Sequence, residues 1–418
     1  MPSKSQYVLA LVFGYVPGYK GGGPIRSVHN LVETLSDEFL FKIVTQDRDL
    51  GEKSPYPGVV KNQWVRVGGA YVMYLGTGFR AILRMCVLLC SVDSETVLYL
   101  NSFFSRKFSM LAVLMRRLKL CRARCLVLAP RGELFEAALE FKRKRKRFYI
   151  NVSRLLGLYS NMIWHASSEL EAATILREFP LARFVDVAGV LSEAACISTK
   201  NGIVATASDL SGTTRGLRRG APPKDPGQLS VVFVARVTRN KNLLEALRIL
   251  EGISGDISFD IYGPIQDTDY WEECRGAISR LPANIHVQYL GEIEHGRVEE
   301  VFSEHHLLLF PTLTENFGHV ISEALSAGCP VLISNQTPWQ HLEAAGVGWD
   351  IPLGDRERFR SVLQQCVNSD REWFTALSIR ARDFALNAAS NSEVITANRQ
   401  IFRRAQNWGI EPMPTLEL

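Results

Sequence analysis

The chain has 418 residues, of which 46% are hydrophobic and 22% charged, the composition of an ordinary soluble globular protein. Its net charge of +5 is mildly basic, which by itself is too weak to indicate a nucleic-acid partner. One hydrophobic core does not extend over this length, so we expect two domains of about 200 residues each.

The cysteines and the apolar runs exclude several further classes. None of the eight cysteines forms a C-x-x-C pair, and no histidine lies at zinc-ligand spacing from one. No signal-peptide core directly follows a basic N-terminus, so we expect reduced thiols in a cytoplasmic protein. Apolar runs such as 81–92 are interrupted by charge and fall short of the ~20 residues that cross a bilayer. The sequence therefore predicts no transmembrane helix.

Strands and helical patterns alternate through the first half of the chain, with strands expected at 7–15, 41–47, 96–102, 125–130 and 162–168. After the first strand, Gly21, Gly22 and Gly23 precede Pro24, and a helix is expected to begin near Ile25. Three glycines let the backbone approach a ligand closely and offer N–H groups at a helix start. The spacing matches neither a dinucleotide fingerprint nor a P-loop, so a flexible surface turn is an equal alternative.

A linker and a second alternating half follow. Residues 199–228 are rich in Gly, Ser, Thr and Pro and lack apolar periodicity, which predicts an interdomain linker. Beyond it, strands are expected at 229–236, 257–263, 286–291, 307–311 and 330–334. This alternation predicts an α/β fold with parallel sheets, arranged as two Rossmann-like domains facing a central crevice. We place the domains at 1–198 and 229–385, with a final helix within 386–418 that crosses back to the first domain.

Two cations follow the first strand of the second half. Arg236 ends the strand and Lys241 lies five residues later, just before a helix. Cations at this position are well placed to bind a diphosphate, although a basic loop in water is an equal alternative. Gly263 and Gly291 end the next two strands, and by position their turns would shape a base pocket.

Two glutamates, Glu315 and Glu323, lie on either side of an expected helix start. Apolar residues follow Gly318 at helical spacing, and Gly328 is placed to end the helix. The N–H groups of such a terminus bind phosphate well. Glu315 would repel a phosphate unless it faced sugar hydroxyls, and Glu323 on the inner face of the helix is placed to bind a ribose. Taken alone, each glutamate is more typical of a loop cap or a solvated helix residue.

Together these residues resemble a known family. Arg236 with Lys241, the Glu315–Glu323 pair and the run 323–334 are similar to the retaining glycosyltransferases of family 4, which have the GT-B fold. The glycine-rich loop lies where that family has one. The stretches 129–148, 164–172 and 334–339 further resemble its bacterial members that build polysaccharides. The resemblance covers nearly the whole chain and is most specific in the second half.

The resemblance implies a role for each residue at a nucleotide sugar. Arg236 and Lys241 would hold the donor diphosphate and stabilise its leaving charge, Glu315 would bind hydroxyls of the donor sugar, and Glu323 would bind the ribose. Further donor contacts are implied for Gly22, Gly23, Gly263, Asn316, Phe317, Gly318 and His319. First-domain contacts are implied for Asn101 and Arg131.

Two departures from the family pattern concern the first domain and the hinge. Many relatives carry a histidine at a first-domain strand end, and Asn101 stands at that place here. The usual Pro-Asn-Gly turn at the domain junction is also absent. His165 follows a later strand, where a histidine is more often a polar anchor for the turn than a catalytic group.

The function that the resemblance implies is transfer of a sugar from a nucleotide-diphosphate sugar to a glycan or lipid-diphosphate-linked acceptor, in surface polysaccharide biosynthesis. No cofactor, metal or nucleic acid is expected. For the metal, the Asp-x-Asp candidate considered, Asp267–Asp269, lies in a polar loop. The alternatives are a GT-B nucleotide-sugar epimerase and a catalytically silent GT-B scaffold subunit. The intact cations and paired glutamates favour transfer over both. Neither the donor sugar nor the acceptor follows from the sequence.

A basic run, Lys142–Arg147, consists of six consecutive cations. On a helix six residues cover more than one turn, so the charge is not confined to one face, and a solvated helix is one interpretation. The resemblance to enzymes that act on membrane-bound acceptors implies another, an anionic membrane surface, with Phe141, Phe148 and Tyr149 at the interface. We therefore expect a cytoplasmic protein that associates peripherally with the inner face of the plasma membrane.

Overall fold

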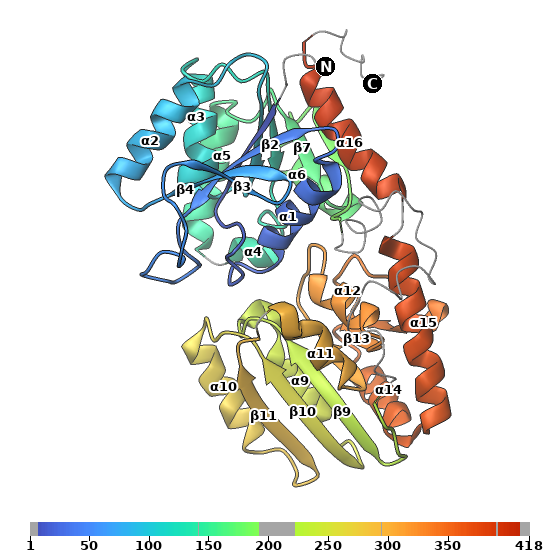
Figure 1. Cartoon of the computed structure of the whole chain (residues 1–418). Helices are drawn as coiled ribbons and strands as arrows, with labels where there is room; N and C mark the ends of the chain where they lie inside the picture. The colour runs from blue at the N-terminus through green and yellow to red at the C-terminus, as the bar shows by residue number, and fades with distance from the viewer. Residues whose placement is uncertain (1–6, 141, 192–221, 294, 390–391, 410–418) are drawn as a thin grey trace. The chain divides into compact units, whose positions relative to one another are not determined.

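The computed structural model describes residues 7–140, 142–191, 222–293, 295–389 and 392–409. The chain divides into two compact units, one formed by residues 1–202 with 391–418 and the other by residues 203–390. Each unit contains its own sheet and its own core (Figure 1). The linker expected at 199–228 lies largely outside the described residues.

The first unit is built on an eight-stranded sheet in the order β3-β4-β2-β1-β5-β6-β7-β8. Its strands are β1 (Tyr7–Val12), β2 (Leu40–Gln46), β3 (Trp64–Val67), β4 (Ala70–Leu75), β5 (Val97–Asn101), β6 (Cys125–Ala129), β7 (Ile163–Ala166) and β8 (Phe184–Val187). The pairings are parallel except for the antiparallel edge hairpin β3–β4.

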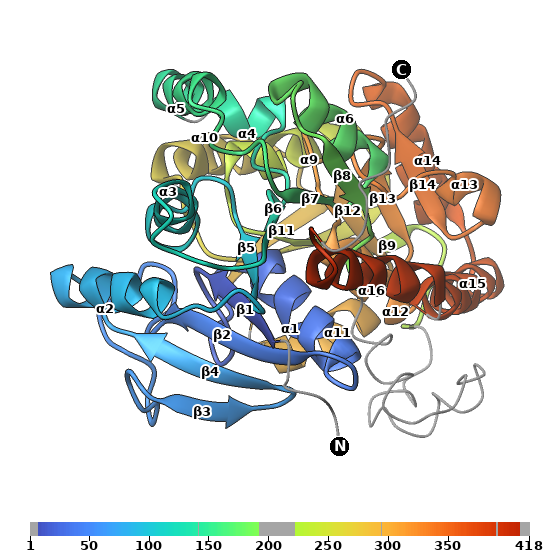
Figure 2. The same cartoon turned by 90° about the horizontal axis from the view of Figure 1, so that it is seen from above.

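Helices cover both faces of this sheet, because alternate residues of each strand point to opposite sides. Leu9 and Leu11 of β1 pack into one core, whereas Val8 and Ala10 pack into the other. The first core is covered by α2 (Phe79–Cys90), α3 (Leu111–Arg117), α5 (Arg143–Leu155) and α6 (Glu169–Glu178). The second core is covered by α1 (Gly23–Leu35) and α16 (Ser392–Gln406), as Figures 1 and 2 show. The π-helical turn η1 (Arg106–Met110) and the short α4 (Glu136–Glu140) complete this unit's described helices.

The second unit is built on a six-stranded parallel sheet in the order β11-β10-β9-β12-β13-β14. Its strands are β9 (Gln228–Val234), β10 (Asp256–Tyr262), β11 (Ile285–Gly291), β12 (Leu307–Phe310), β13 (Val331–Ser334) and β14 (Gly348–Ile351). Its helices are η2 (Arg239–Lys241), α9 (Leu243–Leu250), α10 (Thr268–Ile278), η3 (His295–Arg297), α11 (Val298–Ser303), α12 (His319–Ser326), α13 (Leu342–Ala345), α14 (Arg356–Asn368) and α15 (Arg371–Ala389).

The two α/β sheets, parallel apart from the β3–β4 hairpin, confirm the fold class, and each strand expected from the sequence is present. The sequence analysis missed β3, β8 and β14, which have four residues each and lie at sheet edges, and also β4, which pairs with β3. The first helix begins at Gly23 rather than near Ile25, because Pro24 fits the first turn, where no backbone N–H is needed. In the described part of the chain, none of the helices has the length and apolar character to span a membrane.

Candidate functional site

The site begins where β9 and β10 end side by side. Gly263 follows β10 with a φ of 131°, and a Cβ atom there would lie 1.9 Å from the carbonyl oxygen of Ala235. The Ala235 N–H donates to the Tyr262 carbonyl at 3.0 Å, and the Val237 N–H donates to the Pro264 carbonyl at 2.9 Å. Only glycine permits this approach, which fixes the backbone on both sides of Arg236. Ligands of parallel α/β sheets bind at this edge.

Arg236 is a partly buried cation at this edge. Its guanidinium donates to Gln266 Oε1 at 3.2 Å. Burial lowers the pKa of Arg236, and the carboxylate of Glu315 opposes that shift. Because arginine stays charged even so, the end of β9 presents a permanent positive charge close to Glu315.

Lys241 and Glu315 form an ion pair across two loops. The side chains are only 14% and 17% exposed, so water screens the pair less than a surface salt bridge. Backbone contacts bring the loops together: the Leu313 N–H donates to the Asn240 carbonyl at 2.9 Å, and Asn240 Nδ2 donates to the Thr314 carbonyl at 3.3 Å. The turn η2 therefore holds Lys241 against the loop that follows β12.

Helix α12 starts directly beyond Glu315. Gly318 caps it with a φ of 80°, and a Cβ atom there would lie 2.8 Å from Ile321 Cδ1 and 3.2 Å from Glu315 Cγ. The carbonyl of Phe317 accepts a hydrogen bond from Trp339 Nε1 at 2.6 Å, which fixes the chain before the cap. The first N–H groups of a helix lack carbonyl partners within the helix, so this terminus is suited to an anion or a sugar oxygen.

The structure thus brings together Arg236, Lys241, Glu315 and the start of α12, within one unit. Asn316 and Phe317 lie in the loop before the cap, and His319 is the first residue of the helix. Glu323 lies one turn further along α12 and is partly buried.

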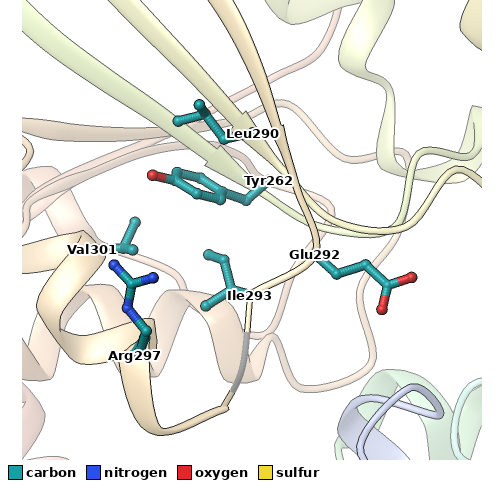
Figure 3. Close-up of a pocket in the computed structure, with 6 residues that line it drawn as sticks. All are labelled: Tyr262, Leu290, Glu292, Ile293, Arg297 and Val301. Atoms are coloured by element: carbon teal, nitrogen blue, oxygen red, sulfur yellow. The ribbon is translucent and has the colours of Figure 1, made fainter.

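A cavity of about 460 Å³ lies at the carboxyl ends of β10 and β11, next to the turns at Gly263 and Gly291. In Figure 3 the ring of Tyr262 and the side chains of Ile293 and Val301 border one space, whereas the Glu292 side chain points away from it. Leu290 and Arg297 complete the lining. The wall is mixed, with the apolar side chains of Leu290, Ile293 and Val301 beside the Tyr262 ring and the Arg297 guanidinium, and a cavity of this size has room for a flat heterocyclic ring.

The glycine loop of the first unit is held by a neighbouring carboxylate. Gly22 caps α1 with a φ of 67°, and Gly23 is the first helical residue. Asp49, just beyond β2, accepts hydrogen bonds from the N–H groups of Tyr19 at 2.8 Å and Lys20 at 3.1 Å. The loop is therefore a fixed helix start rather than a flexible turn. The sequence analysis missed Asp49, because its partners are backbone groups with no side-chain signature.

Asn101 and Arg131 are in direct contact in the first unit. Asn101 Oδ1 accepts from Arg131 Nε at 2.9 Å, and Arg131 also donates to the Tyr99 hydroxyl at 2.6 Å. His165 Nε2 faces the Ala188 carbonyl at 3.0 Å and must carry the hydrogen, so Nδ1 accepts from Tyr99 at 3.2 Å. Burial lowers the pKa of His165 to about 3, with a further contribution from Arg131. His165 is a buried neutral anchor, in agreement with the sequence interpretation.

Two carboxylates that the sequence analysis did not single out hold the loop after β6. Glu133 accepts hydrogen bonds from the N–H groups of Phe103 at 2.6 Å and Phe104 at 2.9 Å. Glu171 accepts one from the Gly132 N–H at 2.5 Å. Burial raises the pKa of the Glu133 carboxyl, and these hydrogen bonds act against that shift. The loop that carries Arg131 is therefore tied to the end of β5 and to α6.

The Asp-x-Asp candidate is occupied by helix capping. Asp267 accepts a hydrogen bond from the Tyr270 N–H at 3.0 Å and caps α10, and Asp269 lies in the first turn of that helix. Over the described ranges, His, Cys, Asp and Glu side chains form no group of three or more that would hold a metal ion.

The basic run divides into an exposed part and an inward-facing part. Lys146 donates to the Ala138 carbonyl at 2.6 Å, and one guanidinium nitrogen of Arg147 donates to both carboxylate oxygens of Glu178, at 2.7 and 2.9 Å. The four preceding cations, Lys142–Arg145, are exposed.

The aromatic neighbours of the run behave differently from the expectation. The expectation that Tyr149 lies at a membrane interface is wrong, because its ring packs against Phe103 and its hydroxyl hydrogen-bonds with that of Tyr159 at 2.5 Å. Phe148 is 71% exposed, and the side chain of Phe141 lies outside the described residues.

Two α/β units, each with a largely parallel sheet, define the GT-B class of fold, and comparison with solved structures agrees. The Anabaena protein HepE in complex with UDP and glucose aligns with a TM-score of 0.64 at 16% identity, over 95% of this chain and 98% of HepE. Sucrose-phosphate synthase from Thermosynechococcus elongatus aligns with a TM-score of 0.65 at 16% identity, over 95% and 98% of the two chains. WaaG, a glycosyltransferase of lipopolysaccharide biosynthesis, aligns with a TM-score of 0.57 at 14% identity, over 96% and 99%.

The sequence comparison is confined to the second unit's part of the chain. Residues 216–377 match the family model described as "Glycosyl transferases group 1". That segment is less than half of the chain and includes Arg236, Lys241, Glu315 and Glu323. None of the curated proteins matches the sequence.

Proposed function

We propose that this chain is a retaining glycosyltransferase, which transfers a sugar from a nucleotide-diphosphate sugar to a glycan or lipid-diphosphate-linked acceptor in surface polysaccharide biosynthesis. The observation that carries the proposal is the cluster of Arg236, Lys241, Glu315 and the start of α12 at the carboxyl edge of the second sheet. The match of residues 216–377 to the glycosyl transferases group 1 model supports it, because that segment contains the whole cluster.

Each part of the cluster suits one part of a nucleotide sugar. The bond between the sugar and the diphosphate breaks during transfer, so negative charge grows on the departing oxygen, where Arg236 and Lys241 stabilise it. Glu315 accepts hydrogen bonds from sugar hydroxyls, and the N–H groups at the start of α12 bind the sugar or the distal phosphate. Glu323 binds the ribose.

The remaining donor contacts come from the cavity and from the first unit. The cavity bordered by Tyr262 and Ile293 takes the nucleobase. For the first unit, the resemblance implies that Gly22 and Gly23 would bind the diphosphate through backbone N–H groups, and that Asn101 and Arg131 would contact the reacting sugar or the acceptor. HepE has been solved with UDP-glucose, which makes UDP-sugars the first donors to test.

Transfer is proposed to need no divalent metal. Cations of the chain supply the charge that a metal would otherwise supply at the diphosphate. The use of Asp267 as a helix cap supports this proposal. Turnover that EDTA abolished and magnesium restored would contradict it.

The central test compares two cations of the same turn. Lys241→Ala removes a contact that strengthens as the diphosphate leaves, so kcat should fall by ~10²-fold or more. Arg239 is the matched control, because its guanidinium pairs with Glu273 on the exposed surface of the unit. Arg239→Ala should leave kcat within about twofold of wild type.

The assay uses a panel of nucleotide sugars with NMR analysis of the sugar product. A product with the donor's anomeric configuration on a new acceptor indicates retaining transfer, whereas an altered ring stereocentre on the free sugar indicates the epimerase alternative. Glu323→Ala should act mainly on the KM of the donor, because ribose is remote from the breaking bond. Small and equal effects of Lys241→Ala and Glu323→Ala would point to a catalytically silent protein.

We further propose that the chain associates peripherally with the cytoplasmic face of a membrane, where a lipid-diphosphate-linked acceptor would lie. The exposed cations Lys142–Arg145 support this association, because each basic residue near an anionic surface contributes ~1 kcal/mol. Lys146 and Arg147 contribute less than the sequence suggested, since they are bound within the unit.

A further inference from the structure

The outer face of α2 is apolar and exposed. Phe79 is 77% exposed, Ile82 43%, Leu83 53% and Val87 63%. Their spacing places them on one side of the helix. The opposite side packs against the first sheet through Ala81, Met85 and Leu89. The helix is therefore apolar on both sides, which burial in its own unit does not explain.

The apolar surface continues onto α3 and the turn after it. Leu114 is 47% exposed, Leu118 59% and Leu120 51%. Figures 1 and 2 both show α2 and α3 side by side in the same helix layer, and the two helices contact each other. Soluble proteins rarely expose large contiguous apolar patches, and such patches commonly mark interaction sites. We call the exposed apolar residues of α2, α3 and the turn after α3 the α2–α3 surface: Phe79, Ile82, Leu83, Val87, Leu114, Leu118 and Leu120.

The charges around the α2–α3 surface are predominantly positive, and the exposed acidic exceptions, Asp93 and Glu95, follow the end of α2. Exposed cations accompany the apolar side chains on both helices and the turn after α3: Arg80, Arg84, Arg117, Lys119 and Arg122. No aspartate or glutamate occurs in residues 76–92 or 96–132. A second copy of the chain docked on the same surface would bring like charges together. An anionic lipid headgroup layer complements both the cations and the apolar face.

We propose that the α2–α3 surface is the apolar membrane contact of this protein, with Phe79, Ile82, Leu83 and Val87 inserted at the interface of an anionic bilayer. The arginine side chains extend to the headgroups while their stems cover apolar surface. This inference rests on the peripheral association proposed above. The side chains that insert into the bilayer then belong to α2 rather than to α5, and the exposed cations of α5 attract the anionic headgroups.

The test is co-sedimentation of the full chain with vesicles, made either of phosphatidylcholine alone or of phosphatidylcholine with phosphatidylglycerol. The variant Ile82→Gln/Leu83→Gln/Val87→Gln should lose about 10-fold or more in affinity for the anionic vesicles, at low and at high salt. The matched control is Ile379→Gln, because Ile379 of α15 in the second unit is 56% exposed and apolar. It should bind like wild type.

Two further variants separate charge from insertion. Arg80→Gln/Arg84→Gln and Lys144→Gln/Arg145→Gln should each weaken binding at low salt and have little effect at high salt, because exposed charges are screened. A fluorophore is attached to Cys90, at the exposed end of α2, in a variant in which Cys196 is replaced by serine. Its emission should shift to the blue when anionic vesicles are added. Thermal unfolding of each variant verifies that the fold is kept.

The outcomes are distinct. Unchanged vesicle binding by the triple glutamine variant, or an unshifted Cys90 label, would overturn the α2–α3 proposal. Loss of self-association in that variant with unchanged vesicle binding would assign the surface to a second copy instead. If wild type bound neither vesicle, the peripheral association would also be wrong, whereas glycosyl transfer, measured with a water-soluble acceptor, would be unaffected.

Discussion

Lys241 and Glu315 form an ion pair that is largely shielded from water. A ligand that binds one of these side chains must therefore compete with the other. In the proposed site, a diphosphate must share Lys241 with Glu315. Removal of the carboxylate charge therefore has opposite consequences for the two parts of the donor. The diphosphate gains a stronger cation, while the sugar loses an acceptor for its hydroxyls.

We predict that Glu315→Gln binds free nucleoside diphosphate about three- to tenfold more tightly than wild type. The same variant should lose ~10²-fold or more in kcat with the complete nucleotide sugar. Isothermal titration with the diphosphate and steady-state kinetics with the donor measure the two effects. Lys241→Ala is the comparison, since it should weaken both. Weaker diphosphate binding in Glu315→Gln would contradict the assignment of Glu315 to the sugar.

At the residue scale, the sequence could predict that Arg236, Lys241 and Glu315 lie at the edge of the sheet, because each stands between a strand and the α-helix that follows it. It could not predict Asp49 or Gln266. Asp49 holds backbone N–H groups 29 and 30 positions away, and Gln266 contacts Arg236 across 30 positions. Such partners depend on how loops fold back, which local patterns do not encode.

At the element scale, the ends of β9 and β10 fit together only because position 263 is glycine. A methyl group there would lie 1.9 Å from the Ala235 carbonyl oxygen, which is backbone and does not rotate away. The chain at 235–237 would have to move, and Arg236 with it.

We therefore predict that Gly263→Ala lowers both the donor affinity and kcat and reduces stability by about 1–3 kcal/mol. Gly252→Ala is the matched control in the same unit, since Gly252 has a φ of 84° but no atom within 4 Å of an added Cβ. The control should show the backbone strain without the loss of donor affinity. Urea unfolding and donor titration measure the two quantities. Equal donor affinities for Gly263→Ala and Gly252→Ala would mean that Gly263 does not shape the donor site.

The elements themselves were predicted where apolar runs were continuous and buried, as in β5 and β12. The edge hairpin of β3 and β4 was missed, although Gly68–Gly69 between two short runs is a typical hairpin signal. None of the four residues of β3 is fully buried, so it lacks the continuous apolar run that marked the other strands. The orientation of α5 was also beyond sequence analysis, since Glu178 of α6 decides which cations of the basic run face inward.

At the scale of the molecule, each unit contains a buried histidine whose pKa burial lowers well below its usual range. His165 donates to the Ala188 carbonyl in the first unit. In the second unit His306 accepts from the Ser230 N–H at 2.9 Å and donates to the Pro223 carbonyl at 2.9 Å. Burial lowers the pKa of His165 to about 3 and that of His306 to about 4. The division into two α/β units was predictable from the alternation of strands, but these cross-links were not, because they join strand ends to distant backbone.

Both histidines make stability depend on pH with the same sign. In the unfolded chain a histidine has a pKa near 6.5, so between that value and the folded pKa the unfolded state binds more protons. The contribution of each histidine to the free energy of unfolding should therefore be largest above about pH 6.5. It should fall as the pH is lowered, by about 2 kcal/mol per histidine between about pH 7 and pH 5.

Urea unfolding across this pH range, followed for wild type and single variants, tests the prediction. Replacement of either buried histidine, as in His165→Gln or His306→Gln, should lower stability at neutral pH and flatten the pH dependence. The control is His286→Gln, because His286 is exposed on β11 and its side chain is 62% accessible. Its pH profile should match that of wild type, so the difference between profiles isolates the buried groups from the titrating carboxylates. A His165→Gln profile as steep as that of wild type would mean that protonation of His165 does not drive acid unfolding of the first unit.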